Sequence, residues 1–298
     1  MSTLKPVERT DWTRRRDAHA ARVDAWVRPH LARRQQGVAH PVEDFLFSYY
    51  SFRPAALRRW HPGYGVVLDD AEEYAGLRGY ELSSGRARVT ADLLESRRAL
   101  LESSVSLLGA TRDRAPHFGC FGLHEWAMVY RQPVDRVRHS SWPLRLGPGG
   151  TDAVVENHRI SCSHFDAFRF FTDAARPLNG LRPGSHDRVE FEQPACLHAG
   201  MDLYKHAYRL TPLLPSELVA DCFALARDIR ALDMRASPYD LLALGYPPVP
   251  VETPEGKQEY VAAQRAFATR AAALRDRLLD GCERLLAGGD ATAARRPG

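Results

Sequence analysis

The feature that most constrains the fold is an apolar stripe of helical period in the last third of the chain. Apolar residues there recur three and four positions apart, at Leu218, Cys222, Leu225, Ile229 and Leu232. A second stripe of the same period runs from 261 to 285, after a Thr-Pro-Glu start at 253–255. This spacing is typical of amphipathic α-helices, which must bury their apolar faces against other elements. The C-terminal part is therefore expected to be a packed helical pair.

The rest of the chain predicts more helices and a few short strands. Helices are expected at 11–35, from Pro41, after Pro54, and at 91–108, 123–131, 166–175 and 201–210. Strands are expected at 65–68, 80–82 and 87–89, between glycines. The predicted fold class is mainly α with a minor β component (α+β), in which a His-rich central region packs on C-terminal helices.

We expect one large domain over 1–287. Its parts are an N-terminal helical part with a small sheet (11–110), the His-rich region (115–210) and the C-terminal helical pair (215–287). The tail 288–298 is expected to be disordered, because it is rich in Ala, Gly and Arg.

Composition excludes several classes of protein. With 44% hydrophobic and 26% charged residues, the chain of 298 is neither disordered nor collagen-like. Five widely spaced cysteines without a CxxC pair, and no secretory signal, favour a reducing, cytoplasmic location. No apolar run reaches the roughly 18 residues needed to cross a bilayer, so no membrane partner is expected. The net charge of +4 permits a phosphate-bearing partner without requiring one.

Histidines mark the middle of the chain as the place for chemistry. Ten of the twelve lie between His40 and His206. Three segments, 116–126, 163–166 and 196–202, each place a histidine near a carboxylate. We expect these segments to converge, so that one cleft is lined by His124, Glu125, His164, Asp166, His198 and Asp202.

Two kinds of chemistry fit these residues. In one, His164, Asp166 and His198 form a two-histidine, one-carboxylate site for iron or zinc, in an enzyme acting on a small molecule or nucleotide. In the other, no cofactor is expected, and Glu125, Asp166, Asp202 and His124 perform acid/base catalysis.

Aromatic and basic residues supply candidates for substrate binding. Trp126, Tyr130, Phe165 and Tyr204 would stack on a planar base, although core packing explains such residues equally well. Arg58, Arg59 and Trp60 precede a Pro-Gly turn, as in a loop that contacts phosphate, and a solvated helix end is the alternative. The polar turn at 233–240, which ends a helix of alternating charges, is expected to lean over the site.

Four strings carry a family resemblance. They are HPVEDFLF at 40–47, RWHPG at 59–63, FGCFGLHEWAM at 118–128 and DMRASPYDL at 233–241. On these strings the chain, from about 17 to 279, resembles a family of bacterial proteins, frequent in high-GC actinobacteria, that are labelled 3-methyladenine DNA glycosylase.

The resemblance implies a hydrolase of DNA repair that excises alkylated purines by cleaving the N-glycosidic bond. Its partner would be DNA containing alkylated bases. It supplies no catalytic residues, so the candidate residues above come from the sequence itself. The alternatives that stay open are the iron or zinc enzyme and a noncatalytic binder of nucleic acid or nucleotides.

Overall fold

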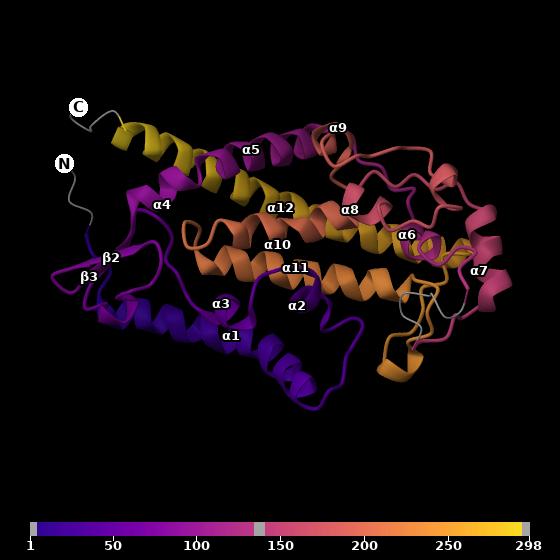
Figure 1. Cartoon of the computed structure of the whole chain (residues 1–298), viewed down its shortest axis with the longest axis horizontal. Coiled ribbons are helices and arrows are strands. Elements are labelled where there is room, and N and C mark those ends of the chain that lie inside the picture. Colours follow the sequence, from indigo (N-terminus) through magenta and orange to yellow (C-terminus); the bar gives the residue numbers. More distant parts are fainter. Residues whose placement is uncertain (1–4, 134–140, 294–298) are drawn as a thin grey trace.

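A computed structural model describes residues 5–133 and 141–293 of the chain (Figure 1). It confirms the predicted class, because helices dominate and the strands form one small three-stranded sheet. None of the helices in these two ranges is both long and apolar enough to span a membrane.

Three long helices form the centre of the molecule. They are α10 (Leu197–Arg209), α11 (Ser216–Arg235) and α12 (Pro254–Ala293), and each packs on the other two. On one side, α5 (Arg98–Asp113) runs along α12, and on the other side α1 (Arg9–Gln35) packs against α11 (Figure 1). The apolar stripes that predicted the C-terminal helices line the core between them, where Cys222, Leu225 and Ile229 are fully buried.

The sheet lies at one end of the helical bundle (Figure 1). Its strands are β1 (Val67–Leu68), β2 (Tyr80–Ser83) and β3 (Arg86–Val89), in the antiparallel order β1-β3-β2. Ser84 and Gly85 connect β2 to β3, and both have positive φ, as two-residue hairpin turns require. A separate small core around Trp12, Trp60 and Leu68 joins this sheet to the helices.

Short helices connect the long ones. They are α2 (Phe45–Tyr49), α3 (Pro54–Arg58), η1 (Glu72–Tyr74), α4 (Ala91–Ser96), α6 (Leu123–Ala127), α7 (Gly147–Glu156), α8 (Phe165–Phe168), η3 (Arg176–Leu178), α9 (Arg188–Phe191) and η4 (Leu242–Leu244). Helices α6 to α9 gather at the end of the bundle away from the sheet (Figure 1). The His-rich region therefore packs on the C-terminal helices.

Four helix predictions need correction. The helix expected from Pro41 begins only at Phe45, because 41–44 form a turn in which the Asp44 N–H donates to the His40 carbonyl. The helix expected at 91–108 is divided at Arg97 into α4 and α5. The helices expected at 123–131 and 166–175 end at Ala127 and Phe168, because the chain after α8 turns so that the Thr172 N–H donates to the Ala127 carbonyl. A tertiary hydrogen bond thus replaces further helix.

The C-terminal end also differs from its prediction. Helix α12 continues to Ala293, so 288–293 are helical where a disordered tail was expected. Ala291 and Ala293 favour helix and no proline interrupts the sequence before 297, whereas Gly288 and Gly289 oppose it. The rest of the predicted tail, 294–298, lies outside the described residues.

Candidate functional site

The convergence expected from the three His-containing segments is confirmed. One cavity of about 30 Å³ is lined by residues from α2, α6, α8, α10 and α11. All six expected residues line it: His124, Glu125, His164, Asp166, His198 and Asp202. The catalytic roles assigned to Glu125, Asp166, Asp202 and His124 stay predictions.

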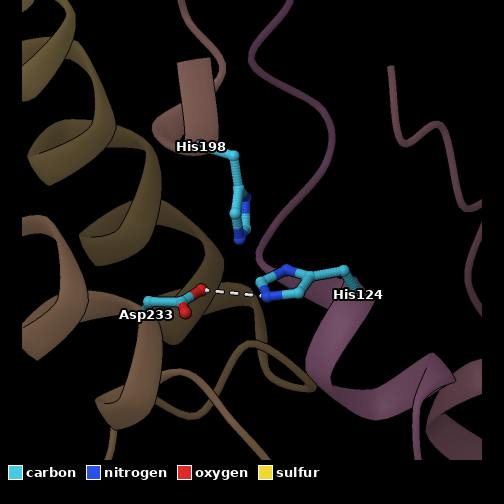
Figure 2. Close-up of side chains that lie close together, drawn as sticks. All are labelled: His124, His198 and Asp233. Carbon is cyan, nitrogen blue, oxygen red and sulfur yellow. Dashed lines mark ion pairs between the residues drawn. The ribbon is translucent and has the colours of Figure 1, made fainter. Parts of the chain in front are cut away.

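At the centre of the site lie two histidines and an aspartate from three helices (Figure 2). One donor atom from each of His124, His198 and Asp233 lies within 4.8 Å of the other two. His124 Nε2 is 3.4 Å from an oxygen of Asp233, and the rings of His124 and His198 meet edge to face at 4.2 Å. Figure 2 shows the imidazole of His198 pointing toward the space between the other two side chains. We call these three residues the histidine site.

Local structure explains why these side chains meet. Gly122 precedes α6 with φ +67°, and a Cβ there would lie 3.3 Å from Tyr260, so the turn that aims His124 inward favours glycine. On α11, Arg230 and Asp233 are three positions apart and share a face. Arg230 Nη1 donates to Glu125 at 2.7 Å and to Asp233 at 2.8 Å, which fixes both carboxylates.

Several buried atoms of the site make no hydrogen bond within the described chain. They include His124 Nε2, Asp233 Oδ1 and Glu125 Oε2, and also Nε and Nη2 of Arg230. A buried polar atom without a partner costs about 1–3 kcal/mol, so such atoms are rare in folded proteins. Two tetrahedral ligands at about 2.0–2.1 Å from a metal ion lie about 3.3 Å apart. The 3.4 Å between His124 and Asp233 fits this spacing.

The pKa values of the two histidines of the site are shifted in opposite directions. Burial lowers the pKa of His124, but the carboxylates of Asp233 and Glu125 outweigh burial and raise it to about 9. Burial and the charge on His124 lower the pKa of His198 to about 3. Neutral imidazole is the form that binds metals, so His198 is ready to act as a ligand, whereas His124 would release a proton on binding.

His164 belongs to a neighbouring network rather than to the histidine site. Its Nε2 lies 3.4 Å from Asp202 and 3.5 Å from Glu192. Arg188 donates to both of these carboxylates, at 2.5 Å to Glu192 and 2.8 Å to Asp202. The positive charge of Arg188 therefore balances negative charge on Glu192 and Asp202.

The predicted metal ligands His164, Asp166 and His198 are not the cluster that the structure brings together. The carboxylate of Asp166 faces Lys205 at 2.9 Å, while His164 faces Asp202 and Glu192. His164 caps α8 and Asp166 lies in its first turn. His164 has extended backbone angles whereas Asp166 is helical, so the two side chains leave the backbone in different directions.

The predicted aromatic residues do not line the cavity. Trp126 and Tyr204 are fully buried in the core, and the indole N–H of Trp126 donates to the Ala236 carbonyl. Tyr130 is buried, and its hydroxyl donates to Glu156. Phe165 is partly exposed but is not among the lining residues.

Arg58, Arg59 and Trp60 lie at a different place. They line an open pocket of about 440 Å³ between α1, α3 and η1, which shares no residue with the His-lined cavity. Arg58 is bonded to Asp24 at 2.7 Å, and the Trp60 indole donates to Glu217. These contacts are typical of a structural surface.

A second cavity, of about 20 Å³, lies on the other side of the two histidines. His124 and His198 line both cavities and therefore form the wall between them. Cys120, Cys162 and Cys196 line this second cavity, and burial raises the pKa of each thiol. The thiols are therefore poor nucleophiles.

Sequence reasoning missed Asp233 and Arg230 as site residues. Their alternating charges suggested intrahelical ion pairs, and the Arg230–Asp233 pair does form. The useful signal was the polar turn at 233–240, which was expected to lean over the site and which begins with Asp233.

Comparison of the chain with protein-family models, curated proteins and solved structures found no match. The family resemblance therefore remains a prediction.

Proposed function

We propose that the protein is a metal-dependent hydrolase in which His124, His198 and Asp233 hold a divalent ion, zinc or iron. One observation carries the proposal. Two histidines and a carboxylate converge in a buried site, where His124 Nε2 and Asp233 Oδ1 face each other as an ion pair at 3.4 Å and neither atom makes a hydrogen bond. Three protein ligands that leave one position open are typical of catalytic metal sites.

A metal ion in this position would act as a Lewis acid that lowers the pKa of water. Side chains of the protein would supply the proton transfer and the positioning. Glu125 lies beside His124, with one oxygen held by Arg230 and the other without a hydrogen bond. Burial raises the pKa of Glu125, but Arg230 and His124 outweigh burial and hold it well below its usual value, so the carboxylate is ionised and can accept a proton from water and pass it to a leaving group. Arg230 also holds Asp233, which keeps the ligand and the base in a fixed relation. At about 10–15 Å³ for one water, the 30 Å³ cavity has room for about two.

Excision of an alkylated purine, which the resemblance implies, is also a hydrolysis. One observation favours the metal-dependent reaction over it. The buried Trp126 and Tyr204 offer no open face on which a base could stack.

The test begins with metal content. Protein purified without a chelating tag is expected to contain close to one zinc or iron per chain by elemental analysis. After removal of the metal, a titration against a chromophoric chelator is expected to show one tight zinc site. The loaded protein is then assayed with a panel of ester, amide, N-glycoside and phosphoester substrates.

Glu125→Gln is the decisive variant for the role of the base. It keeps the size of the side chain and is expected to keep zinc while losing roughly a hundredfold or more of any hydrolytic rate. Glu255→Gln, at an exposed acid in the first turn of α12, is the matched control. Failure of the chain to bind any divalent transition metal would refute the proposal.

A further inference from the structure

Helix α12 buries an arginine whose guanidinium makes no hydrogen bond. Arg275 is 1% exposed, and its Nε, Nη1 and Nη2 have no partner within residues 5–133 and 141–293. Arg230 on α11 is buried to the same degree, at 2% exposed, but it donates to Glu125 and Asp233. Because arginine stays protonated in proteins, Arg275 puts a positive charge into the core that no hydrogen-bonded carboxylate balances.

The surroundings of Arg275 do not supply the missing negative charge. Burial lowers the pKa of its guanidinium, against smaller raising effects of Asp276, Glu192 and Cys196. Asp276 is exposed at the next position of α12. Glu192 already accepts a hydrogen bond from Arg188. The Cys196 thiol stays protonated, because burial raises its pKa well above the ordinary value. A counter-ion would therefore have to come from outside the chain.

The guanidinium lies near the start of α10, which runs in the same direction as α12. The Gln264 side chain donates to the Ala195 carbonyl, and a Cβ at Gly200 would lie 3.7 Å from the Ala271 Cβ. Arg275 follows Ala271 by one helical turn. Long helical side chains lean toward the N-terminus of their own helix, so Arg275 reaches back toward the first turn of α10. The residue that precedes α10 acts on the pKa of Arg275, as this position requires.

The first turn of α10 is uncapped. The helix has 13 residues, no side chain caps its N-terminus, and its first turn contains no acidic residue. Its first internal hydrogen bond runs from the Gly200 N–H to the Cys196 carbonyl at 3.0 Å, so the N–H groups before Gly200 have no carbonyl acceptor in the helix. Such an N-terminus attracts anions, and a buried guanidinium beside it adds a full positive charge.

We propose that a small monovalent anion, for which chloride is the probe, binds between Arg275 and the first turn of α10. The guanidinium and the free N–H groups would both donate to it, and its single charge would balance that of Arg275. A dianion such as sulfate would bring excess charge into the core at a larger cost of desolvation. The anion would hold the turn that carries His198. This site is separate from the proposed hydrolase and does not depend on a metal ion.

Unfolding of the metal-free full chain in sodium chloride and in sodium gluconate, at equal ionic strength, tests the proposal. Gluconate is too large for an interior site, so the comparison removes general salt effects. Chloride should stabilise the fold saturably. At about ten times the Kd of chloride, the unfolding equilibrium constant should be about elevenfold smaller than in gluconate.

Arg275→Met removes the charge and keeps a long side chain. This variant should lose the response to chloride, and in gluconate it should be at least as stable as wild type, because an unpaired buried charge destabilises the fold. Arg277→Met is the matched control. Arg277 lies on the same helix, is half exposed and pairs with Asp221 at 2.8 Å. Its variant should keep the full response to chloride.

Bromide gives a second measurement that needs no variant. Anomalous scattering from a wild-type crystal grown in sodium bromide should place an ion beside the Arg275 guanidinium. Bromide found only at exposed arginines would overturn the proposal, as would equal stability in chloride and gluconate. A chloride response that persists in Arg275→Met, or that is lost equally in Arg277→Met, would overturn it as well.

Discussion

Two buried clusters in this molecule contain the same residue types but differ in how many of their polar atoms are hydrogen-bonded. Near the N-terminus, Asp44 meets His30 and Arg33, and in the histidine site Asp233 meets His124 and Arg230. Both oxygens of Asp44 are fully bonded: they accept from His30 at 2.9 Å, from Arg33 at 2.5 and 3.1 Å, and from the His40 N–H at 2.9 Å. Asp233 accepts a hydrogen bond only from Arg230, and its other oxygen is ion-paired with His124 Nε2 at 3.4 Å without a hydrogen bond.

The difference separates a structural cluster from a candidate catalytic one. A completed network stabilises the fold by itself, whereas an incomplete one holds polar atoms in place at a cost in stability. Composition alone does not distinguish the two, because each contains a histidine, an aspartate and an arginine. Hydrogen-bond completion does distinguish these two clusters, and the neighbouring His164 network also has two buried nitrogens without a hydrogen bond.

The largest expected effect concerns metal affinity. His124→Ala removes one of three proposed ligands and is expected to weaken zinc binding by at least about 100-fold, since each ligand carries a large share of the binding free energy. His30→Ala removes a histidine of the same type from the Asp44 cluster and should leave zinc affinity unchanged. A competition titration with a chromophoric chelator measures both. Equal zinc affinity in the two variants would erase the distinction between the clusters.

Metal should also stabilise the fold through the histidine site alone. At a free zinc concentration 100 times the Kd, linkage predicts a gain of about 2.7 kcal/mol in the free energy of unfolding. Thermal or urea unfolding with zinc, and again with excess chelator, measures this gain. Asp44→Asn should keep it and His198→Leu should lose it. A zinc gain retained by His198→Leu would mean that the ion binds elsewhere.

The Asp44 cluster predicts a pH-dependent loss of stability. Burial raises the pKa of Asp44, but hydrogen bonds from Arg33, His30 and the His40 N–H outweigh burial and lower it. Its contribution to stability is therefore present above the unfolded pKa of about 3.9 and is lost as the pH falls through the lower, folded-state pKa. Asp44→Asn is expected to cost about 2 kcal/mol at pH 7.

Urea unfolding of wild type and Asp44→Asn between pH 2.5 and 7 measures this effect. The difference between the two proteins should shrink as the pH falls below about 4. A difference that stays constant down to pH 2.5 would show that the charge of Asp44 contributes no stability.

The smallest expected effect compares two histidines in metal-free protein. His30→Leu removes a hydrogen bond to Asp44 and is expected to cost about 1 kcal/mol. His198→Leu replaces a neutral ring at the edge of the cavity and should change stability by less than about 0.5 kcal/mol. Urea midpoints in excess chelator measure both values. A larger loss in His198→Leu would make that histidine primarily structural.

The sequence predicted the parts of the molecule that depend on local pattern. The period of the apolar stripes predicted α11 and α12, because a helix of this length needs one continuous buried face. The β2–β3 hairpin followed from glycines between short apolar runs. The convergence of His124, His164 and His198 followed from their density in one region. These predictions needed no knowledge of distant contacts.

The metal ligands could not be predicted without knowledge of contacts between residues far apart in the sequence. His164 and Asp166 are only two positions apart in the sequence and suggested a pair, but in the structure their side chains face different partners. Asp233 lies far from His124 and His198 in the sequence, and only the packing of α10 against α11 brings it to His198. Short motifs report which residues are available, whereas the tertiary fold decides which of them meet.

The α10–α11 hairpin also sets the order in which the histidine site is assembled during folding. His198 lies in the first turn of α10 and Asp233 in the last turn of α11, so closing this one hairpin brings them together. His124 comes from α6, much earlier in the chain, and joins them only by closing a longer loop. In refolding of the full chain, His198 and Asp233 are therefore expected to form a two-donor half-site before His124 joins them.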